Sequence, residues 1–259
     1  MIKTNYPDFR SCFMQASSDG DGCSGKNNQE VECVNCILDS MCQLLDYAKP
    51  DAELPEGILL RHRPVARGET IYRQDDPFRA VFAVKSGSFK SLMLGEDEQE
   101  QVVGFSLPGE MIGAEGMAEK LYPSTVRALE ASHICELRIE RLPESGRPLA
   151  LLQQRMIELL GREVAFNRKL MASIIQQSSE QRLAAFLLNL SQRYGSRGYA
   201  AHEFVLMMPW ADVGSYLGLA SETVSRVLSK FQKADMLVLK KKRITQLNTN
   251  ALSDLVERS

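Results

Sequence analysis

Cysteine is the residue whose spacing in this chain points most directly to chemistry. Cys33, Cys36 and Cys42 fall within a stretch of ten residues, and Cys135 stands alone far downstream in strand-like sequence. Thiolates bind soft metals, and an iron–sulfur cluster needs four of them. The pattern therefore predicts a metal or iron–sulfur site built from three sulfurs near the N-terminus and one from a distant strand.

Zinc is an alternative occupant of the same site. Cys135 could complete it, and so could His133, because residues two apart in a strand point to the same face.

An iron–sulfur redox enzyme or electron carrier is an alternative from a different functional class. The sequence shows no second prosthetic-group motif, no phosphate-binding glycine loop and no Ser/His/Asp set, so we do not expect an enzyme.

The first 28 residues are polar and rich in glycine, with runs such as SSDGDG and SGKNN. They contain too few apolar side chains to form a core, so residues 1–28 are predicted to be a disordered tail. Cys12 and Cys23 lie in this tail. We interpret both as spare thiols rather than as metal ligands.

The charge of the chain is unevenly distributed. Its 259 residues are enough for two domains, and the net charge is −2. Residues 178–259 carry eleven basic and seven acidic side chains, a net charge of +4, so the rest of the chain is acidic. A basic module on an acidic body is typical of a DNA-binding domain attached to another domain. The sequence contains neither a bilayer-length apolar run nor a signal peptide, which predicts a cytoplasmic protein with no membrane partner and reduced thiols.

A helix-turn-helix is the strongest structural signal near the C-terminus. Pro209 favours a helix start, small Gly214 would let two helices approach closely, and Gly218 would supply the turn. Ser221 and the two residues after it are expected to cap a second helix that continues to Lys233. The residues predicted to contact DNA are Ser221, Glu222, Ser225, Arg226, Lys230 and Lys233.

The predicted roles of these side chains follow from their chemistry. Arg226 can pair with guanine through two hydrogen bonds, and Glu222 can accept one from cytosine. Lys230 and Lys233 would reach phosphates. Residues 237–245 are expected to form a two-stranded wing whose basic tip, KKKR at 240–243, also meets phosphate.

Two further segments precede the helix-turn-helix. Residues 58–142 are rich in β-formers and punctuated by glycine, which predicts a small antiparallel barrel or jelly roll. Residues 147–177 carry an apolar stripe at helical spacing, which predicts a dimerisation helix. We therefore expect an α+β chain with a sensor domain at 29–146, this helix, and a DNA-binding domain at 178–259. The predicted dimer contacts are Leu152, Met156, Leu159, Glu163, Asn167 and Leu170.

Three motifs together resemble the CRP/FNR family of bacterial transcription regulators, and most closely its FNR/Anr branch. They are EQRLAAF at 180–186, YLGL at 216–219 and ETVSR at 222–226, and the resemblance extends from about residue 30 to the end. It implies a β-roll like that of cyclic-nucleotide-binding domains, a long dimerisation helix and a winged helix-turn-helix. The E-x-x-S-R pattern implies a homodimer on palindromic promoter DNA of the type TTGAT-N4-ATCAA.

The resemblance also implies a cofactor. In the FNR branch, a Cys-x2-Cys-x5-Cys set and one distant cysteine hold an oxygen-labile 4Fe–4S cluster, so Cys33, Cys36, Cys42 and Cys135 are the implied ligands. The intact cluster is expected to favour the DNA-binding dimer. Oxygen is expected to convert the cluster to a 2Fe–2S form, and the dimer then separates into monomers. Nitric oxide or a haem-bound gas remains an alternative signal.

Two partner predictions come from the same resemblance. The hairpin GEDEQE at 95–100 resembles a loop that contacts RNA polymerase. The cyclic-nucleotide pocket of the family needs an arginine where YPST stands at 122–125, and a glutamate where Ala114 stands. We therefore expect no binding of cAMP.

Overall fold

The structure is a computed structural model that describes residues 58–95, 97–139 and 177–257, together with separate helical positions between 154 and 176. Several predictions fall outside these described residues. They concern the tail at 1–28, the ligands Cys33, Cys36 and Cys42, and the dimer contacts Leu152, Met156, Leu159, Glu163, Asn167 and Leu170.

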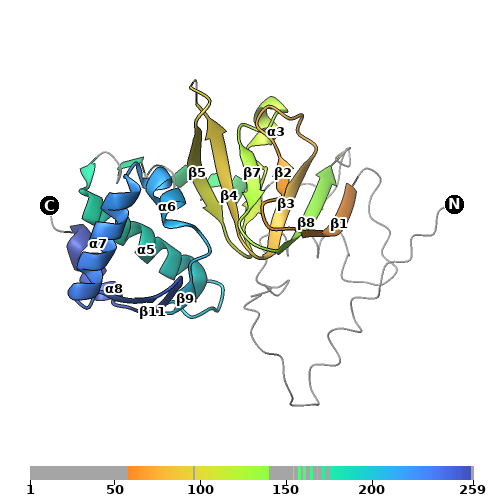
Figure 1. Cartoon of the computed structure of the whole chain (residues 1–259). Helices are drawn as coiled ribbons and strands as arrows, with labels where there is room; N and C mark the ends of the chain where they lie inside the picture. The colour runs from red at the N-terminus through yellow and green to blue at the C-terminus, as the bar shows by residue number, and fades with distance from the viewer. Residues whose placement is uncertain are drawn as a thin grey trace, which may run out of the picture.

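The N-terminal domain is a roll made of two four-stranded antiparallel sheets (Figure 1). The strand order in the first sheet is β1 (Ile58–Val65), β8 (Ser132–Ile139), β3 (Ala80–Ser86) and β6 (Met111–Ile112). The strand order in the second sheet is β2 (Thr70–Tyr72), β7 (Thr125–Ala128), β4 (Phe89–Leu94) and β5 (Glu100–Ser106). A short helix, α3 (Gly116–Glu119), precedes β7. The predicted β-roll is therefore present.

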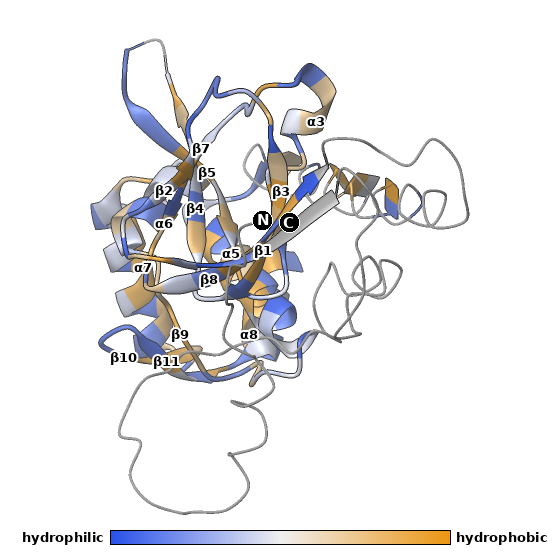
Figure 2. Ribbon diagram, turned by 90° about the vertical axis from the view of Figure 1, so that its right-hand side faces the viewer, coloured by the Kyte–Doolittle hydropathy of each residue, from blue (hydrophilic) through white to orange (hydrophobic). Residues whose placement is uncertain are grey.

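The core of the roll lies between its two sheets. Phe82 of β3 and Ile134 of β8 belong to the same buried cluster as Phe89 of β4 and Val126 of β7. Each of these side chains is at most 5% exposed. Strand residues alternate between faces, so each strand delivers every second side chain to this interior. Apolar residues, orange in Figure 2, run through the middle of the roll, while the β4–β5 hairpin is largely hydrophilic.

The C-terminal domain combines helices with a small sheet. Its elements are α5 (Ser179–Gly195), β9 (Phe204–Val205), α6 (Trp210–Leu217), α7 (Ser221–Lys233), β10 (Leu237–Lys240), β11 (Arg243–Leu247) and α8 (Thr249–Glu257). The predicted two-stranded wing is β10 and β11, and β9 adds a third strand beside β11. The sequence did not reveal β9 because a two-residue strand has no periodicity. The predicted α+β fold class is confirmed.

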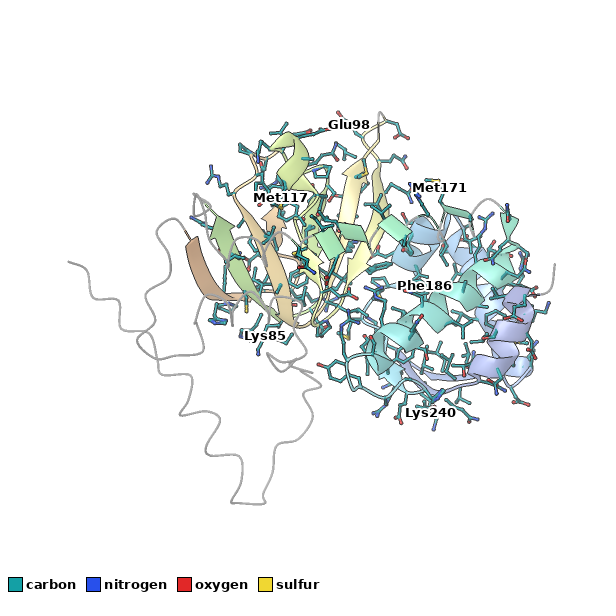
Figure 3. The ribbon with its side chains drawn as sticks, turned by 180° about the vertical axis from the view of Figure 1, so that it is seen from behind. Lys85, Glu98, Met117, Met171, Phe186 and Lys240 are labelled. Carbon is teal, nitrogen blue, oxygen red and sulfur yellow. The ribbon has the colours of Figure 1, made fainter. Side chains whose placement is uncertain are left out.

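The two domains share one apolar cluster. Val102 and Phe105 of β5 are buried together with Phe186 and Leu190 of α5. Figure 3 shows Phe186 on the side of the C-terminal domain that faces the roll, with Glu98 at the hairpin tip and Lys240 at the far end of the wing. In the described part of the chain, no helix has the length and apolar character needed to cross a membrane.

Candidate nucleic-acid interface and metal centre

The two helices of the helix-turn-helix are brought together by two glycines. Gly218 ends α6 in the left-handed region, with φ of 64°, which an L side chain adopts at a cost. A Cβ atom on Gly214 would lie 2.7 Å from the carbonyl oxygen of Leu219. Any larger residue at position 214 would therefore push the turn away from α6. Pro209 precedes the first helical residue, as predicted.

Helix α7 separates a buried face from an exposed face. Its apolar residues Val224, Val227, Leu228 and Phe231 are at most 5% exposed and pack into the domain core. The residues predicted to contact DNA all lie on the exposed side, namely Ser221, Glu222, Ser225, Arg226, Lys230 and Lys233. The helix thus offers a continuous polar face of suitable length for a major groove.

The predicted cap of α7 was wrong. The N-cap residue is Ala220, and no side chain caps the helix; Ser221 is its first helical residue. Ala220 has extended backbone angles, with ψ of 146°, so the chain turns one residue earlier than the serine pattern suggested. The Ser221 hydroxyl is thereby left at the exposed N-terminus of the helix, beside Glu222.

The EQR motif at the start of α5 has three separate structural roles. Gln181 forms a capping box with Ser178, which satisfies free N–H groups at the helix start. Arg182 donates through Nη1 to the carbonyl oxygen of Leu217 at 3.3 Å, tying α5 to the end of α6. Glu180 reaches Lys230 on α7, whose Nζ lies 2.7 Å from both carboxylate oxygens. In the free chain Lys230 therefore has an internal partner, although it is 63% exposed.

The wing ends in a basic turn. Lys240 pairs with Arg243 across the hairpin, so Lys241 and Lys242 form the two-residue tip. Both tip residues are exposed, and Lys241 adopts a φ of 57°. Arg243 forms an ion pair with Glu203 at 2.6 Å. Both tip lysines are therefore accessible from solvent.

Cys135 is the predicted metal ligand that falls within the described residues. It is 7% exposed and its thiol is not in a disulfide. Ile134 points into the roll, so Cys135 faces outward from β8. The neighbouring strand β3 is buried at every position, which shows that this outer face is also shielded from water. A reduced, shielded thiol directed away from the core fits a role as one cluster ligand.

A histidine that sequence reasoning missed lies beside Cys135. His62 is directly opposite Cys135 in the β1–β8 ladder, and its Nδ1 is 3.2 Å from the cysteine Sγ. His133, the alternative zinc ligand, is exposed and its Nδ1 lies 3.2 Å from the hydroxyl oxygen of Ser86. Among the residues that the structure describes, no three His, Cys, Asp or Glu side chains form a metal-binding group.

A buried carboxylate joins the roll to α5. Glu110 accepts from Arg193 through both oxygens, at 2.8 Å from Nε and 2.5 Å from Nη2. Arg197, in the turn that follows the end of α5 at Gly195, donates to the same carboxylate at 2.7 Å. The backbone N–H of Leu107 also donates to it, at 2.9 Å. All three charged side chains are at most 17% exposed.

A second contact joins the roll to α6. Lys90 of β4 forms an ion pair with Asp212 at 2.8 Å, and both side chains are less than one-fifth exposed, at 17% and 18%. The backbone N–H of Val102 donates to the Ser215 hydroxyl at 3.0 Å. Tyr216 packs edge-on against Phe105 with ring centroids 5.3 Å apart, and burial raises its pKa to about 12. The roll therefore holds both α5 and α6.

Comparison with known proteins gives the family of this chain. The cyclic nucleotide-binding domain family matches residues 62–144, and the Crp-like helix-turn-helix domain family matches residues 181–255. The transcriptional activator protein FnrA of Stutzerimonas stutzeri is 37% identical over 88% of this chain and 93% of its own length. The chain belongs to the CRP/FNR family. The fumarate and nitrate reduction regulatory protein of Escherichia coli K12 is 34% identical over 87% of the chain and 90% of its own length.

The solved structures agree with this CRP/FNR assignment at the level of the fold. FixK2 from Bradyrhizobium japonicum superposes with a TM-score of 0.69 and 24% identity, over 78% of this chain and 99% of its own. The family relatives are transcription regulators and not enzymes, so the predictions of family and of a non-enzymatic role are confirmed. This CRP/FNR chain is a DNA-binding transcription regulator.

The Glu110 cluster predicts an acid-sensitive domain contact in this CRP/FNR protein. Burial alone would raise the pKa of Glu110, but the charges of Arg193 and Arg197, together with hydrogen bonds from Arg193 and the Leu107 N–H, outweigh it and hold the pKa below the ordinary value of 4.5. A carboxylate with a lowered folded-state pKa stabilises the fold above its ordinary pKa, and this stabilisation is lost as the pH falls through the folded-state value.

We therefore expect Glu110→Gln to lower the free energy of unfolding by about 3 kcal/mol at pH 7. The difference from the unmodified protein should shrink as the pH drops below 4.5, because Glu110 becomes protonated first in the unfolded chain and then, at its lower pKa, in the folded protein. Urea unfolding of both proteins from pH 7 downward measures this. A difference that stays constant down to the lowest pH would show that charge plays no part in the contact.

Proposed function

We propose that this regulator senses oxygen through a 4Fe–4S cluster held by Cys33, Cys36, Cys42 and Cys135. The observation that carries the proposal is the placement of Cys135, a shielded reduced thiol on the outer face of β8. The names of the relatives, which include fumarate and nitrate reduction regulators, point in the same direction. A bound cluster would supply the reactivity toward oxygen.

The chain's own residues supply the rest of the sensing site. Cys135 provides a sulfur from a rigid strand that is paired on both sides, with His62 on β1 and Ala83 on β3. The imidazole of His62 lies within hydrogen-bonding distance of that sulfur, where it can help to orient the ligand. The proposed sensor domain spans residues 29–146, so one ligand belongs to the roll and three belong to the segment before it.

The proposed homodimer is supported by an exposed apolar stripe. Ile157, Val164 and Met171 are helical, are spaced by seven residues, and are 70%, 51% and 65% exposed in the single chain. The seven-residue spacing places these three side chains on one face of the helix, next in sequence to the predicted contacts Met156, Glu163 and Leu170, and such a face is buried when two helices pair. We propose that the helix at 147–177 pairs with its copy, and that two α7 helices then read the halves of a TTGAT-N4-ATCAA palindrome.

We propose that the β4–β5 hairpin contacts RNA polymerase. The hairpin projects from the body, and Asp97 and Glu98 at its tip are exposed, as such a contact requires.

The interior of the roll bears on nucleotide binding. Tyr72 stacks on Tyr122 with ring centroids 3.7 Å apart, and Ala114 is buried. We propose that these side chains fill the space that a cyclic nucleotide would need, so cAMP should leave DNA binding unchanged.

Anaerobic purification provides the direct test of the sensor. The proposal expects brown protein with about four iron and four sulfide per chain, and a gel shift with the palindrome that is lost after exposure to air. Colourless protein with one zinc per chain, and DNA binding that is insensitive to air, would instead support the zinc alternative. Spectra of bound haem would contradict the cluster directly.

Arg226 is expected to read a base. It is exposed on the first half of α7, and a guanidinium there can donate two hydrogen bonds to guanine. Arg226→Ala should weaken binding to the palindrome by about 1–3 kcal/mol and relax specificity at the guanine position. Fluorescence anisotropy with duplexes substituted at each position measures this. An equal loss on every sequence would mean that Arg226 contacts phosphate alone.

A further inference from the structure

We infer that Glu110, although it lies in the β-roll, is a positioning residue for DNA binding. Its hydrogen-bond partners are Leu107 of the roll, Arg193 of α5 and Arg197 just after α5, so it acts on how the C-terminal domain is held on the roll. The inference concerns the DNA-binding activity shared by the family and does not depend on which signal the protein senses.

The geometry at Glu110 restricts movement of α5. A guanidinium that pairs with both carboxylate oxygens fixes a planar arrangement, unlike a single point contact. Arg193 makes this double contact and also donates to the carbonyl oxygen of Phe105 at 2.7 Å. Arg197 approaches the same carboxylate from the turn after α5 and donates to the carbonyl oxygen of Arg193 at 2.5 Å. Glu110 is itself anchored through the N–H of Leu107. Helix α5 therefore cannot rotate without breaking several hydrogen bonds.

A second contact between the domains prevents the C-terminal domain from rotating about the Glu110 contact. Lys90 forms an ion pair with Asp212 at the start of α6, and the N–H of Val102 donates to the hydroxyl of Ser215 one turn later. Two attachments on two different helices define one orientation of the domain. In that orientation Arg226 and the wing tip are exposed. The contact therefore presents the DNA-reading face rather than covering it.

A fixed orientation matters most for a palindrome. Both recognition helices must enter grooves about 34 Å apart, so each subunit must hold its helix correctly. If the correctly oriented fraction falls to about one-third per subunit, the two factors multiply and the apparent affinity falls about tenfold. Binding to random-sequence DNA needs no such register, because it depends on phosphate contacts.

The test uses Glu110→Gln in the full chain, prepared without air. We expect about tenfold weaker binding to the TTGAT-N4-ATCAA duplex and a change below about twofold on a random duplex of equal length. Hydrogen exchange at residues 101–107 and 212–216 should become faster. The matched control is Glu69→Gln, because Glu69 pairs with Arg63 and accepts from the backbone N–H of Ala66 at 2.8 Å, both within the N-terminal domain. This control should resemble the unmodified protein in both measurements.

The two-variant comparison separates positioning from simple stabilisation. If Glu110→Gln lowers the melting temperature but leaves palindrome affinity unchanged, the positioning role is wrong. Tighter binding would also overturn it, because the orientation held by Glu110 would then be the one that does not fit DNA. Arg193→Gln should weaken palindrome binding as much as Glu110→Gln, and the double variant should add little further loss.

A second variant keeps the inference testable if Glu110→Gln does not fold. Lys90→Met removes the other contact from the roll side and leaves the Glu110 cluster intact. It should produce the same selective loss on the palindrome, and an equal loss on both duplexes would overturn the inference. If the unmodified protein does not bind the palindrome, the proposed operator is wrong. The positioning role of Glu110 is then tested by hydrogen exchange alone, and unchanged exchange in the variants would refute that role.

Discussion

Cys135→Ala should abolish anaerobic binding to the palindrome, reducing it to the level of random DNA, a fall on the order of 1,000-fold. The reason is that an iron–sulfur cluster requires four protein ligands, and Cys135 is the one supplied by the roll. Iron and sulfide content should fall together with operator binding. Anaerobic absorption spectra and gel shifts on the same preparation measure both effects.

Matched cysteine variants control for damage to the fold. Cys135 is 7% exposed, but the substitution removes a single sulfur atom, so the cavity is small and the circular dichroism spectrum should stay unchanged. Cys12→Ala should retain both the cluster and DNA binding. Equal effects of the two substitutions would refute the ligand assignment. His133→Ala distinguishes the zinc alternative, because it should matter only if His133 is a ligand.

Val164→Glu should convert the protein to a monomer and remove most of its affinity for the palindrome. Val164 is 51% exposed in the single chain, so a charge there should change the stability of the monomer by less than about 0.5 kcal/mol. In a paired helix the same charge would be buried against its copy without a partner. Loss of the second recognition helix should cost about 100-fold or more in operator affinity.

Ala165 provides the control for this substitution. It is also exposed and helical, but it lies one residue away from the stripe of Ile157, Val164 and Met171. Ala165→Glu should therefore leave a dimer that binds the palindrome. Sedimentation velocity on both variants gives the oligomeric state. If Val164→Glu remains dimeric, the stripe is not the seam of the dimer.

Local patterns explain why some features could be predicted from the sequence. Helix α7 was recognised because Val224, Val227, Leu228 and Phe231 recur at helical spacing, and this periodicity fixes the opposite face as well. The glycines at 214 and 218 were recognised because turns and close helix contacts need them. The cap was misplaced by one residue because serine is a common N-cap, whereas the residue with the extended backbone angles of an N-cap is Ala220. Its side chain cannot cap the helix, so no signal in the sequence marked it.

The sequence by itself determined three features of this protein: a cysteine set suited to iron, a β-roll and a helix-turn-helix. The helical spacing of its apolar residues also determined which face of the second helix is exposed. Only the tertiary structure placed His62 beside Cys135, 73 residues away, and Glu110 between Arg193 and Arg197, more than 80 residues away. Such pairs depend on strand register and domain packing, which bring distant segments together, whereas periodicity and turn chemistry act only between near neighbours in the chain.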